Sequence, residues 1–145
     1  MTRYVLDTNI ISNITKPSPS PTLLAWLAAQ NDDDLFISAL TIGEIRRGIL
    51  EKPAGKKRSA LEAWFAGPEG PPSLFAGRVL AFDEQASLVW ARLMARGTTT
   101  GRPRSALDMI IAAVAEANDC MVATDNENDF AGLKFVNPLR ERKAD

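Results

Sequence analysis

Short runs of apolar residues alternate along the chain with longer stretches in which apolar residues recur every three or four positions. The short runs predict β-strands, and the longer stretches predict helices between them. The strand runs are continuously apolar instead of alternating with polar residues, which is typical of parallel strands covered by helices on both faces. We therefore expect an α/β fold with strands at 4–6, 35–37, 79–82, 121–124 and 134–136.

Serine residues mark where several of the helices should begin. Ser20 precedes a proline, and Ser38 and Ser105 precede apolar helical patterns, so each is a predicted N-cap. The segment 97–104, rich in Gly, Thr and Arg, is a predicted polar loop. We expect helices at 8–14, 20–27, 38–50, 55–66, 83–95 and 105–118.

The composition narrows the chemistry that such a fold can perform. The 145 residues include no His and one Cys, and 17 Lys and Arg against 18 Asp and Glu give a formal net charge of -1. Without His there is no Ser-His-Asp triad, no imidazole base and no His-ligated zinc. Catalysis must therefore use carboxylates, Lys, Tyr, or a metal ion held by oxygen atoms.

No segment has the pattern of a secretion signal or a membrane span. Asp7 interrupts the first apolar run after three residues, and the longest uncharged apolar stretch covers only 109–115, whereas a span needs roughly 18 residues. The single Cys120 has no partner for an internal disulfide, which favours a reducing compartment. We expect a soluble cytoplasmic protein without membrane contact.

Acidic residues follow several of the predicted strands, at the position where an open parallel sheet binds its ligands. Asp7 directly follows the first strand, and Glu44 lies about two turns into the helix that follows the second. Asp108 lies in the first turn of a late helix, and the segment 125–129, rich in Asp and Asn, directly follows the fourth strand. These side chains are therefore candidates for one acidic site.

Each of these acids also has a purely structural interpretation, and the residues alone leave both open. Asp7 can cap the first helix, and the segments 41–44 and 105–108 resemble capping boxes. The helix dipole favours acids at such positions in any protein. The segment 125–129 has the composition of a solvated turn.

Asp108 is the acid that a capping role explains least well. It shares a helix face with Ile111, Ala112 and Ala115, and no Lys or Arg lies one turn further on. A carboxylate on a buried face costs several kcal/mol unless a cation compensates it. A divalent metal held together with Asp7 would supply that charge, and oxygen-only ligands favour Mg²⁺ or Mn²⁺.

Four motifs follow one another along the chain. They are Asp7-Thr8-Asn9, Thr41-x-x-Glu44-Ile45-x-x-Gly48, Asp108-x-x-Ile111-Ala112-Ala113 and Thr124-x-Asn126-x-x-Asp129-Phe130. Together they resemble the PIN-domain ribonucleases, in particular the VapC toxins of bacterial toxin–antitoxin pairs, and the segments 76–83 and 132–138 resemble their FitB-type branch. The resemblance implies a PIN-like three-layer α/β/α fold with a mainly parallel, roughly five-stranded sheet. It implies a single domain over 1–138 and a charged tail over 139–145.

The resemblance also implies an activity, that of a metal-dependent endoribonuclease acting as the toxin of a type II toxin–antitoxin pair. Asp7 and Asp108 would be the main Mg²⁺ ligands, and Glu44 would complete the site or orient the attacking water. Such a toxin would be a homodimer, and a small VapB-like antitoxin would neutralise it.

One position departs from the family pattern. The family's fourth acidic position aligns with Asn126, and Asp125 and Asp129 lie on either side of it. Either acid could supply the missing charge, as a metal ligand or as a catalytic group. Asn126 could still coordinate a metal through its carbonyl oxygen or position a water.

Contacts with the RNA substrate are predicted at threonines and arginines near these motifs. The candidates are Thr8, Arg46, Arg47, Arg102, Arg104 and Thr124. The arginines would offset the repulsion between RNA and an acidic site, although a solvated helix face is the alternative for the first two. The threonines could orient carboxylates, with ordinary strand-end hydrogen bonding as their alternative.

Two other functions stay open at this point. A phosphatase of the haloacid dehalogenase type also begins with Asp after its first strand, but it needs a second Asp where Asn9 stands. A non-catalytic metal-binding or RNA-binding module could keep the same fold without turnover. The three acids at the first three motifs favour the nuclease.

Overall fold

The computed structural model describes residues 1–140 of the chain. Its strands are β1 (Tyr4–Leu6), β2 (Leu35–Ser38), β3 (Val79–Leu80), β4 (Met121–Ala123) and β5 (Phe135–Val136). Its helices are α1 (Thr8–Ile14), α2 (Pro21–Ala28), α3 (Ala39–Leu50), α4 (Lys56–Ala66), α5 (Pro71–Leu74), α6 (Glu84–Thr99), α7 (Ala106–Ala117) and α8 (Glu127–Phe130), and a 3-10 turn, η1 (Asp32–Asp34), precedes β2. None of the helices within residues 1–140 combines the length and the apolar character that crossing a bilayer requires.

All five strands pair in parallel, in the order β3-β2-β1-β4-β5. The predicted α/β class and the predicted strands are confirmed. β3 is shorter than predicted, because the chain leaves the sheet after Leu80 and Phe82 packs edge to face against Trp90 of α6. Since every strand runs in the same direction, all five carboxyl ends lie at one edge of the sheet.

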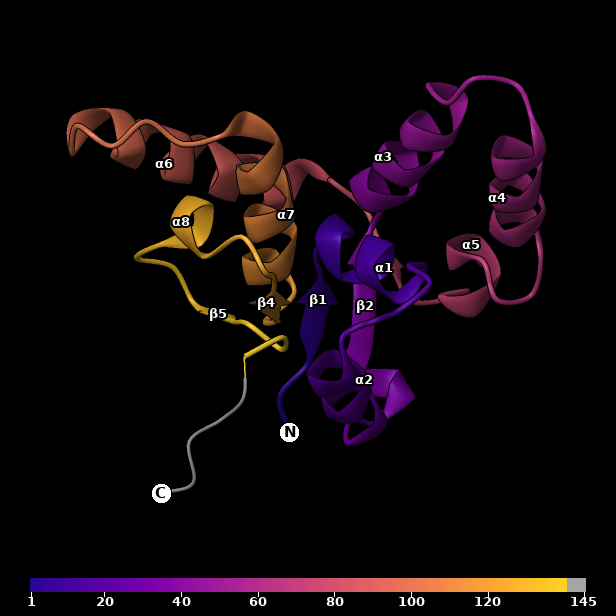
Figure 1. Cartoon of the computed structure of the whole chain (residues 1–145). Coiled ribbons are helices and arrows are strands. Elements are labelled where there is room, and N and C mark those ends of the chain that lie inside the picture. The colour runs from indigo at the N-terminus through magenta and orange to yellow at the C-terminus, as the bar shows by residue number, and fades with distance from the viewer. Residues whose placement is uncertain (141–145) are drawn as a thin grey trace.

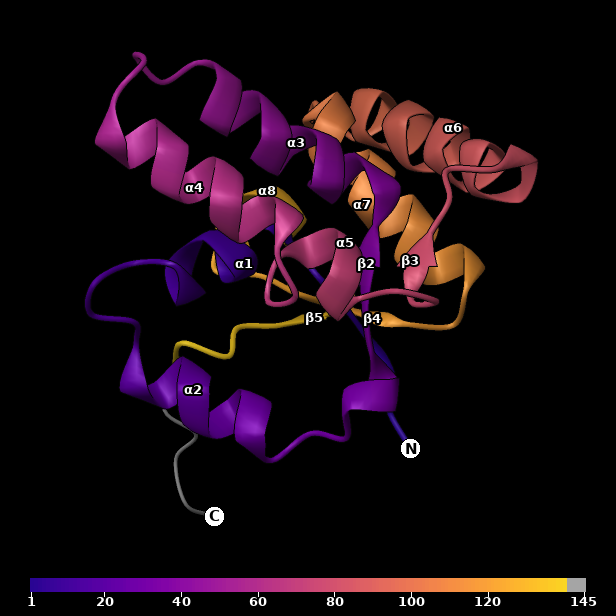
Figure 2. The same ribbon diagram turned by 90° about the vertical axis from the view of Figure 1, so that its right-hand side faces the viewer.

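Alternate side chains of the central strand β1 enter two apolar cores, one on each face of the sheet. Tyr4 and Leu6 pack in the first core with side chains from α1 and α2 and with Phe75, which directly follows α5. Val5 packs in the second core with α6, α7 and α8. Figure 1 shows α6, α7 and α8 on one side of the strands, and Figure 2 shows α3 and α4 lying side by side. The predicted three-layer arrangement is therefore confirmed.

The predicted N-caps are also confirmed. The hydroxyls of Ser20, Ser38 and Ser105 each accept a backbone N–H from the first turn of α2, α3 and α7, respectively. Each serine thereby satisfies a donor that the helix cannot pair internally. These caps fix where α3 and α7 begin, and therefore where the acids on those helices lie.

Helix α6 continues to Thr99, through residues that the sequence predicts as a loop. The hydroxyl of Thr98 donates to the carbonyl oxygen of Met94 (3.3 Å), which gives this polar side chain a partner within the helix. Gly97 is buried where the following loop folds back on α6, and a Cβ there would lie 2.8 Å from the carbonyl oxygen of Arg102. This glycine therefore serves close packing instead of a turn.

The chain stays packed one residue beyond the predicted end of the domain. Leu139 lies against the first core, and its N–H donates to Oδ1 of Asn137 (3.0 Å). The last five residues of the predicted tail, 141–145, lie outside the described residues.

Candidate active site

The ends of β1 and β4 bring the first and last motifs together. Asp7 directly follows β1 and Thr124 directly follows β4, and these two strands are neighbours in the sheet. Figure 1 shows α1, α3 and α7 near the carboxyl ends of these strands. Glu44 on α3 and Asp108 on α7 lie close enough for their charges to act on Asp7. Residues that are distant in the sequence thus meet at one edge of the sheet.

Asp7 is almost completely buried, with 4% of its surface exposed. Its Oδ1 accepts the N–H of Thr8 (2.8 Å), and its Oδ2 accepts the hydroxyl of Thr124 (2.8 Å) and the amide of Asn9 (3.3 Å). Burial raises the pKa of Asp7 above its usual value, the bonds from Thr124 and Thr8 lower it, and nearby carboxylates raise it. Asp7 is therefore both a helix cap and a buried carboxylate that the protein holds with its own donors.

Thr8 links Glu44 to Asp7, because its backbone N–H donates to Asp7 and its hydroxyl donates to Glu44. Thr8 Oγ1 lies 2.7 Å from Glu44 Oε1 and 3.1 Å from Oγ1 of the buried Thr41. Because a hydroxyl has one proton, Thr8 donates to the carboxylate and accepts the proton of Thr41. The capping-box interpretation of 41–44 is wrong, since Ser38 caps α3 and Glu44 lies in the second turn.

Asn9 connects the two strand ends, a role that the sequence does not assign to it. Its Nδ2 lies 3.3 Å from both Asp7 Oδ2 and Thr124 Oγ1, and its Oδ1 accepts the N–H of Asp125 (3.2 Å). Thr41, predicted only as part of a capping box, is the second residue whose role the sequence does not predict. Each of the two shares a motif with one of the acids, and that position is the only signal in the sequence for their contribution.

Asp108 and Asp129 form a carboxyl pair. Asp108 is half-buried, and burial, the hydrogen bond with Asp129 and the charges of Asp7 and Asp129 raise its pKa to about 7. Asp129 is exposed, and hydrogen bonds from Asn126 Nδ2 (2.7 Å) and from Asp108 lower its pKa. Near neutral pH the pair therefore binds one proton, and Asp108 is the carboxyl group that carries it. Ser105 Oγ caps the helix by accepting the N–H of Asp108 (3.3 Å).

We call these side chains the acidic site: Asp7, Glu44, Asp108, Asn126 and Asp129. No ion pair among residues 1–140 involves any of them. In the same part of the chain no three acidic or Cys side chains surround one point closely enough to hold a metal by themselves. Mg²⁺ needs fewer protein ligands than that, since it usually keeps several waters and binds through one or two carboxylates. A cation would also relieve the repulsion that raises the pKa values of Asp7 and Asp108, so the donor set fits a divalent metal.

The structure does not bring Asp125 into the acidic site. Its exposed Oδ1 accepts the amide of Asn137 (3.1 Å), from the loop after β5. The same amide donates to Oε2 of Glu127 (2.9 Å). Of the two acids on either side of Asn126, the one whose side chain faces the site is Asp129.

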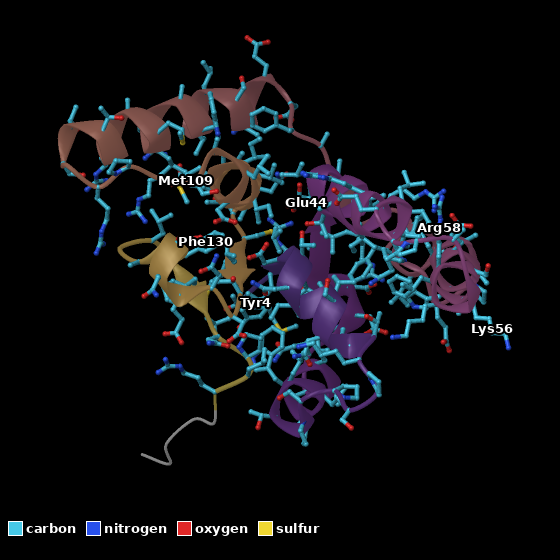
Figure 3. All side chains as sticks on the ribbon, turned by 45° about the horizontal axis from the view of Figure 1, so that its top comes forward. Tyr4, Glu44, Lys56, Arg58, Met109 and Phe130 are labelled. Atoms are coloured by element: carbon cyan, nitrogen blue, oxygen red, sulfur yellow. The ribbon has the colours of Figure 1, made fainter. Side chains whose placement is uncertain are left out.

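The arginines predicted on α3 are engaged elsewhere. Arg46 Nη1 lies 3.4 Å from a carboxylate oxygen of Glu62 on α4, and Arg47 pairs with an acid one turn further along its own helix (3.4 Å). Figure 3 shows Lys56, the first residue of α4, on the far side of that helix from Glu44. The charges of Arg46 and Arg47 are therefore paired with acids outside the acidic site.

Arg104 lies much nearer. Its Nη1 donates to the backbone carbonyl of Asp129 (3.2 Å), so the loop before α7 touches the rim of the acidic site. Arg102 stands two residues earlier in the same loop. Arg104 thus lies beside the site, and Arg102 lines one pocket together with Arg104.

Fold and site together define a class of protein, an α/β domain with a parallel sheet whose strand-end carboxylates are suited to a divalent cation. The PIN-domain family pattern matches residues 4–136. The VapC ribonuclease Y4jK of Sinorhizobium fredii is 45% identical over 136 residues, which cover 92% of this chain and 96% of that protein. The toxin FitB of Neisseria gonorrhoeae is 35% identical over 139 residues, which cover 94% of this chain and 99% of that protein. The chain belongs to the PIN-domain family, and its resemblance to the VapC and FitB toxins is confirmed.

The same relationship appears in three dimensions. The crystal structure of FitAcB from Neisseria gonorrhoeae contains a chain that superimposes on this one with a TM-score of 0.85 at 34% identity. The match covers 93% of this chain and 97% of that chain. The predicted PIN-like fold is therefore confirmed by both sequence and structure.

Proposed function

We propose that this protein is a divalent-metal-dependent endoribonuclease, which acts in the cytoplasm as the toxin of a type II toxin–antitoxin pair. The names of its relatives, a VapC ribonuclease and the toxin FitB, support this assignment. The observation that carries it is the acidic site, where three carboxylates influence one another at the carboxyl edge of the sheet. In a chain without His, such carboxylates can supply the metal-binding chemistry that cleaves a phosphodiester.

Asp7 and Asp108 are the residues that would hold Mg²⁺ or Mn²⁺, because their negative charges have no basic partner among the described ion pairs. When bound, the ion lowers the pKa of a coordinated water and stabilises the negative charge that develops on the phosphodiester. Asp129 faces Asp108 and supplies the fourth carboxylate in place of the Asn126 position, and Asn126 holds it through its amide.

The protein's own side chains prepare this site before any ligand arrives. Thr124 and Asn9 fix one oxygen of Asp7 from within the fold. Thr8 fixes Oε1 of Glu44, which leaves the second oxygen of Glu44 to accept a hydrogen bond from the attacking water. Positioning of this kind lowers the cost of ordering the site during the reaction.

The partners follow from the same assignment. The protein pairs with a VapB-like antitoxin, as the solved relative FitAB is a complex. It also forms a homodimer, for which α6 and its neighbouring loops offer exposed apolar side chains, Leu88 with 67% exposure among them. The phosphatase alternative has no support, because Asn9 donates its amide to Asp7 in place of the second acid that such chemistry needs.

The Asp7→Asn variant tests the proposed activity. We expect Mg²⁺-dependent cleavage of single-stranded RNA to fall by about 100-fold or more, since even the outer partners of metal ligands typically contribute 10–100-fold. Induction of this variant should also leave cell growth unaffected, in contrast to the wild type. The measurement is the cleavage rate of a labelled RNA with Mg²⁺ and with EDTA, alongside a circular dichroism melt to establish folding.

Asp33→Asn is the matched control. Asp33 is exposed in η1, before β2, and so lies at the opposite edge of the sheet from the acidic site. Its variant should cleave at the wild-type rate. If highly purified Asp7→Asn protein cleaved RNA as fast as the Asp33→Asn control, cleavage would not depend on the acidic site and the proposed function of that site would be wrong. A folded wild type that binds RNA but does not cleave it in Mg²⁺ would instead be a non-catalytic module of the same fold.

A further inference from the structure

Three arginines line one pocket at the end of α6. The pocket has a volume of about 340 Å³ and lies between the last turns of α6, the loop before α7 and the loop after α8. Arg96, Arg102 and Arg104 provide its charged wall, and Leu93 and Leu133 provide its apolar part. We call it the arginine pocket.

No arginine of this pocket forms an ion pair among residues 1–140, although the charge of Arg104 acts on the nearby Asp129 and helps to lower the pKa of that carboxyl. The arginines that do form such pairs are Arg46, Arg47, Arg58, Arg92 and Arg140. A concave site with several guanidinium groups and no carboxylate is suited to an anion, because guanidinium forms paired hydrogen bonds with phosphate oxygens.

Glycines allow the pocket to form. The N–H of Arg102 donates to the carbonyl oxygen of Gly97 (2.9 Å), which folds the loop back on α6. A Cβ on Gly97 would lie 2.8 Å from Arg104 Cγ, and a Cβ on Gly132 would lie 3.4 Å from Arg104 Nη2. Gly132 also has a φ of +85°, which a residue with a side chain rarely adopts. The side chain of Arg104 therefore runs between two glycines that leave it room.

Asp129 connects this pocket to the acidic site. Its backbone carbonyl accepts the bond from Arg104 Nη1 (3.2 Å), and its carboxylate faces Asn126 and Asp108. The two sites of opposite charge thus lie on either side of one residue. A polyanion bound with one phosphodiester at the carboxylates can place another phosphate over the arginines.

We propose that the arginine pocket binds a backbone phosphate of the RNA substrate, beside the phosphodiester that the acidic site cleaves. This inference rests on the proposed ribonuclease function and adds Arg96 to the residues that the sequence predicts for substrate binding. Contacts with phosphates position a strand without reading its sequence. The pocket therefore contributes affinity and register, and it leaves the choice of bases to other residues.

Binding of a labelled single-stranded RNA oligonucleotide, followed by fluorescence anisotropy in EDTA, tests the pocket without any cleavage. The variants are Arg96→Gln, Arg102→Gln, Arg104→Gln and the triple substitution, all at exposed or half-exposed positions that should tolerate the change. Arg92→Gln is the matched control, since it removes the same charge one turn earlier on α6 from an arginine that already pairs with Glu116.

We expect each arginine that binds a phosphate to contribute about tenfold in affinity. The slope of log affinity against log salt should become shallower by about 0.7 for each phosphate that a variant no longer neutralises. Two RNAs of different sequence should bind each pocket variant more weakly by the same factor, and Arg92→Gln should leave the slope unchanged.

A triple variant with the wild-type affinity and slope, or with no greater loss of affinity than Arg92→Gln, would overturn the inference. Loss of RNA binding in the triple variant alongside a wild type that fails to cleave in Mg²⁺ would refute the proposed function and leave the pocket standing.

Discussion

The acidic site has two sides that the protein treats differently. On the strand side, Asp7 is buried and receives hydrogen bonds from Thr8, Asn9 and Thr124. On the helix side, Asp108 is half-buried and faces the carboxylate of Asp129. Hydrogen-bond donors thus hold the carboxylate of Asp7, whereas the carboxyl group of Asp108 lies against a second negative charge.

This difference separates what the fold supplies from what a ligand must supply. Donors within the protein stabilise the charge of Asp7 and fix its geometry in advance. The carboxyl pair on the helix side is stable near neutral pH only with a shared proton or with a cation in its place. The strand side is therefore preformed, whereas the helix side carries a charge that the proposed metal would balance.

The largest effect on stability should come from removing a donor on the strand side. Thr124→Val deletes the hydroxyl that donates to Asp7 Oδ2 inside the fold. Because a hydrogen bond to a charged group contributes about 2 kcal/mol, the free energy of unfolding should fall by that amount. Urea denaturation measures this loss of stability.

Thr98→Val is the control, since it deletes an exposed hydroxyl on α6 and should change stability by less than about 0.5 kcal/mol. Equal effects of the two substitutions would contradict a special role for the strand side.

A second, smaller effect should appear when metal and pH are varied together. The folded protein keeps a proton on Asp108 up to a pH of about 7, whereas the unfolded chain loses it near 3.8. The folded state therefore binds more protons in this range, and without metal the free energy of unfolding should fall as the pH rises from about 4 to about 7. The lowered pKa of Asp129 acts only below that range.

If Mg²⁺ binds the deprotonated carboxylates, as the proposed function requires, it should stabilise the protein more at about pH 8 than at about pH 5. Urea denaturation in EDTA and in excess Mg²⁺ at both pH values measures this difference. In the Asp108→Asn variant the difference should shrink. A Mg²⁺ stabilisation that is equal at both pH values, and equal in the variant, would mean that the metal does not bind at Asp108.

The smallest effects should distinguish the two acids on either side of Asn126. Asp129→Asn removes the charge that faces Asp108, so the pKa of Asp108 should fall toward its usual value. Asp125→Asn should leave that pKa unchanged, because the carboxylate of Asp125 bonds Asn137 instead. Carboxyl NMR titration of both variants measures the shift. A larger shift in Asp125→Asn than in Asp129→Asn would show that the fourth acid is Asp125.

Much of this protein is encoded by local patterns along the chain. The apolar runs predict all five strands, and the serines at 20, 38 and 105 predict where three helices begin. These features depend on neighbouring residues, since a strand is recognised by its own side chains and a cap by the turn that it satisfies. The position of Asp7 directly after the first strand follows from the same local information.

The errors arise where a side chain chooses between partners that are distant in the sequence. Glu44 has the spacing of a capping residue but bonds Thr8 of another helix. Arg46 is a predicted RNA contact but pairs with Glu62. Gly97 marks a loop in the sequence, yet in the fold it lets that loop pack against α6. The spacing of residues along the sequence does not specify where these side chains point in the fold.

The sequence by itself determined a parallel α/β protein with acids at its strand ends and no His to share their chemistry. The tertiary structure decided that Asp129 completes the acidic site, that Asn9 and Thr124 hold Asp7, and that three arginines surround one pocket beside it. The physical reason is that hydrophobic periodicity is local, whereas the pairing of charges and donors depends on which surfaces the packed helices bring together.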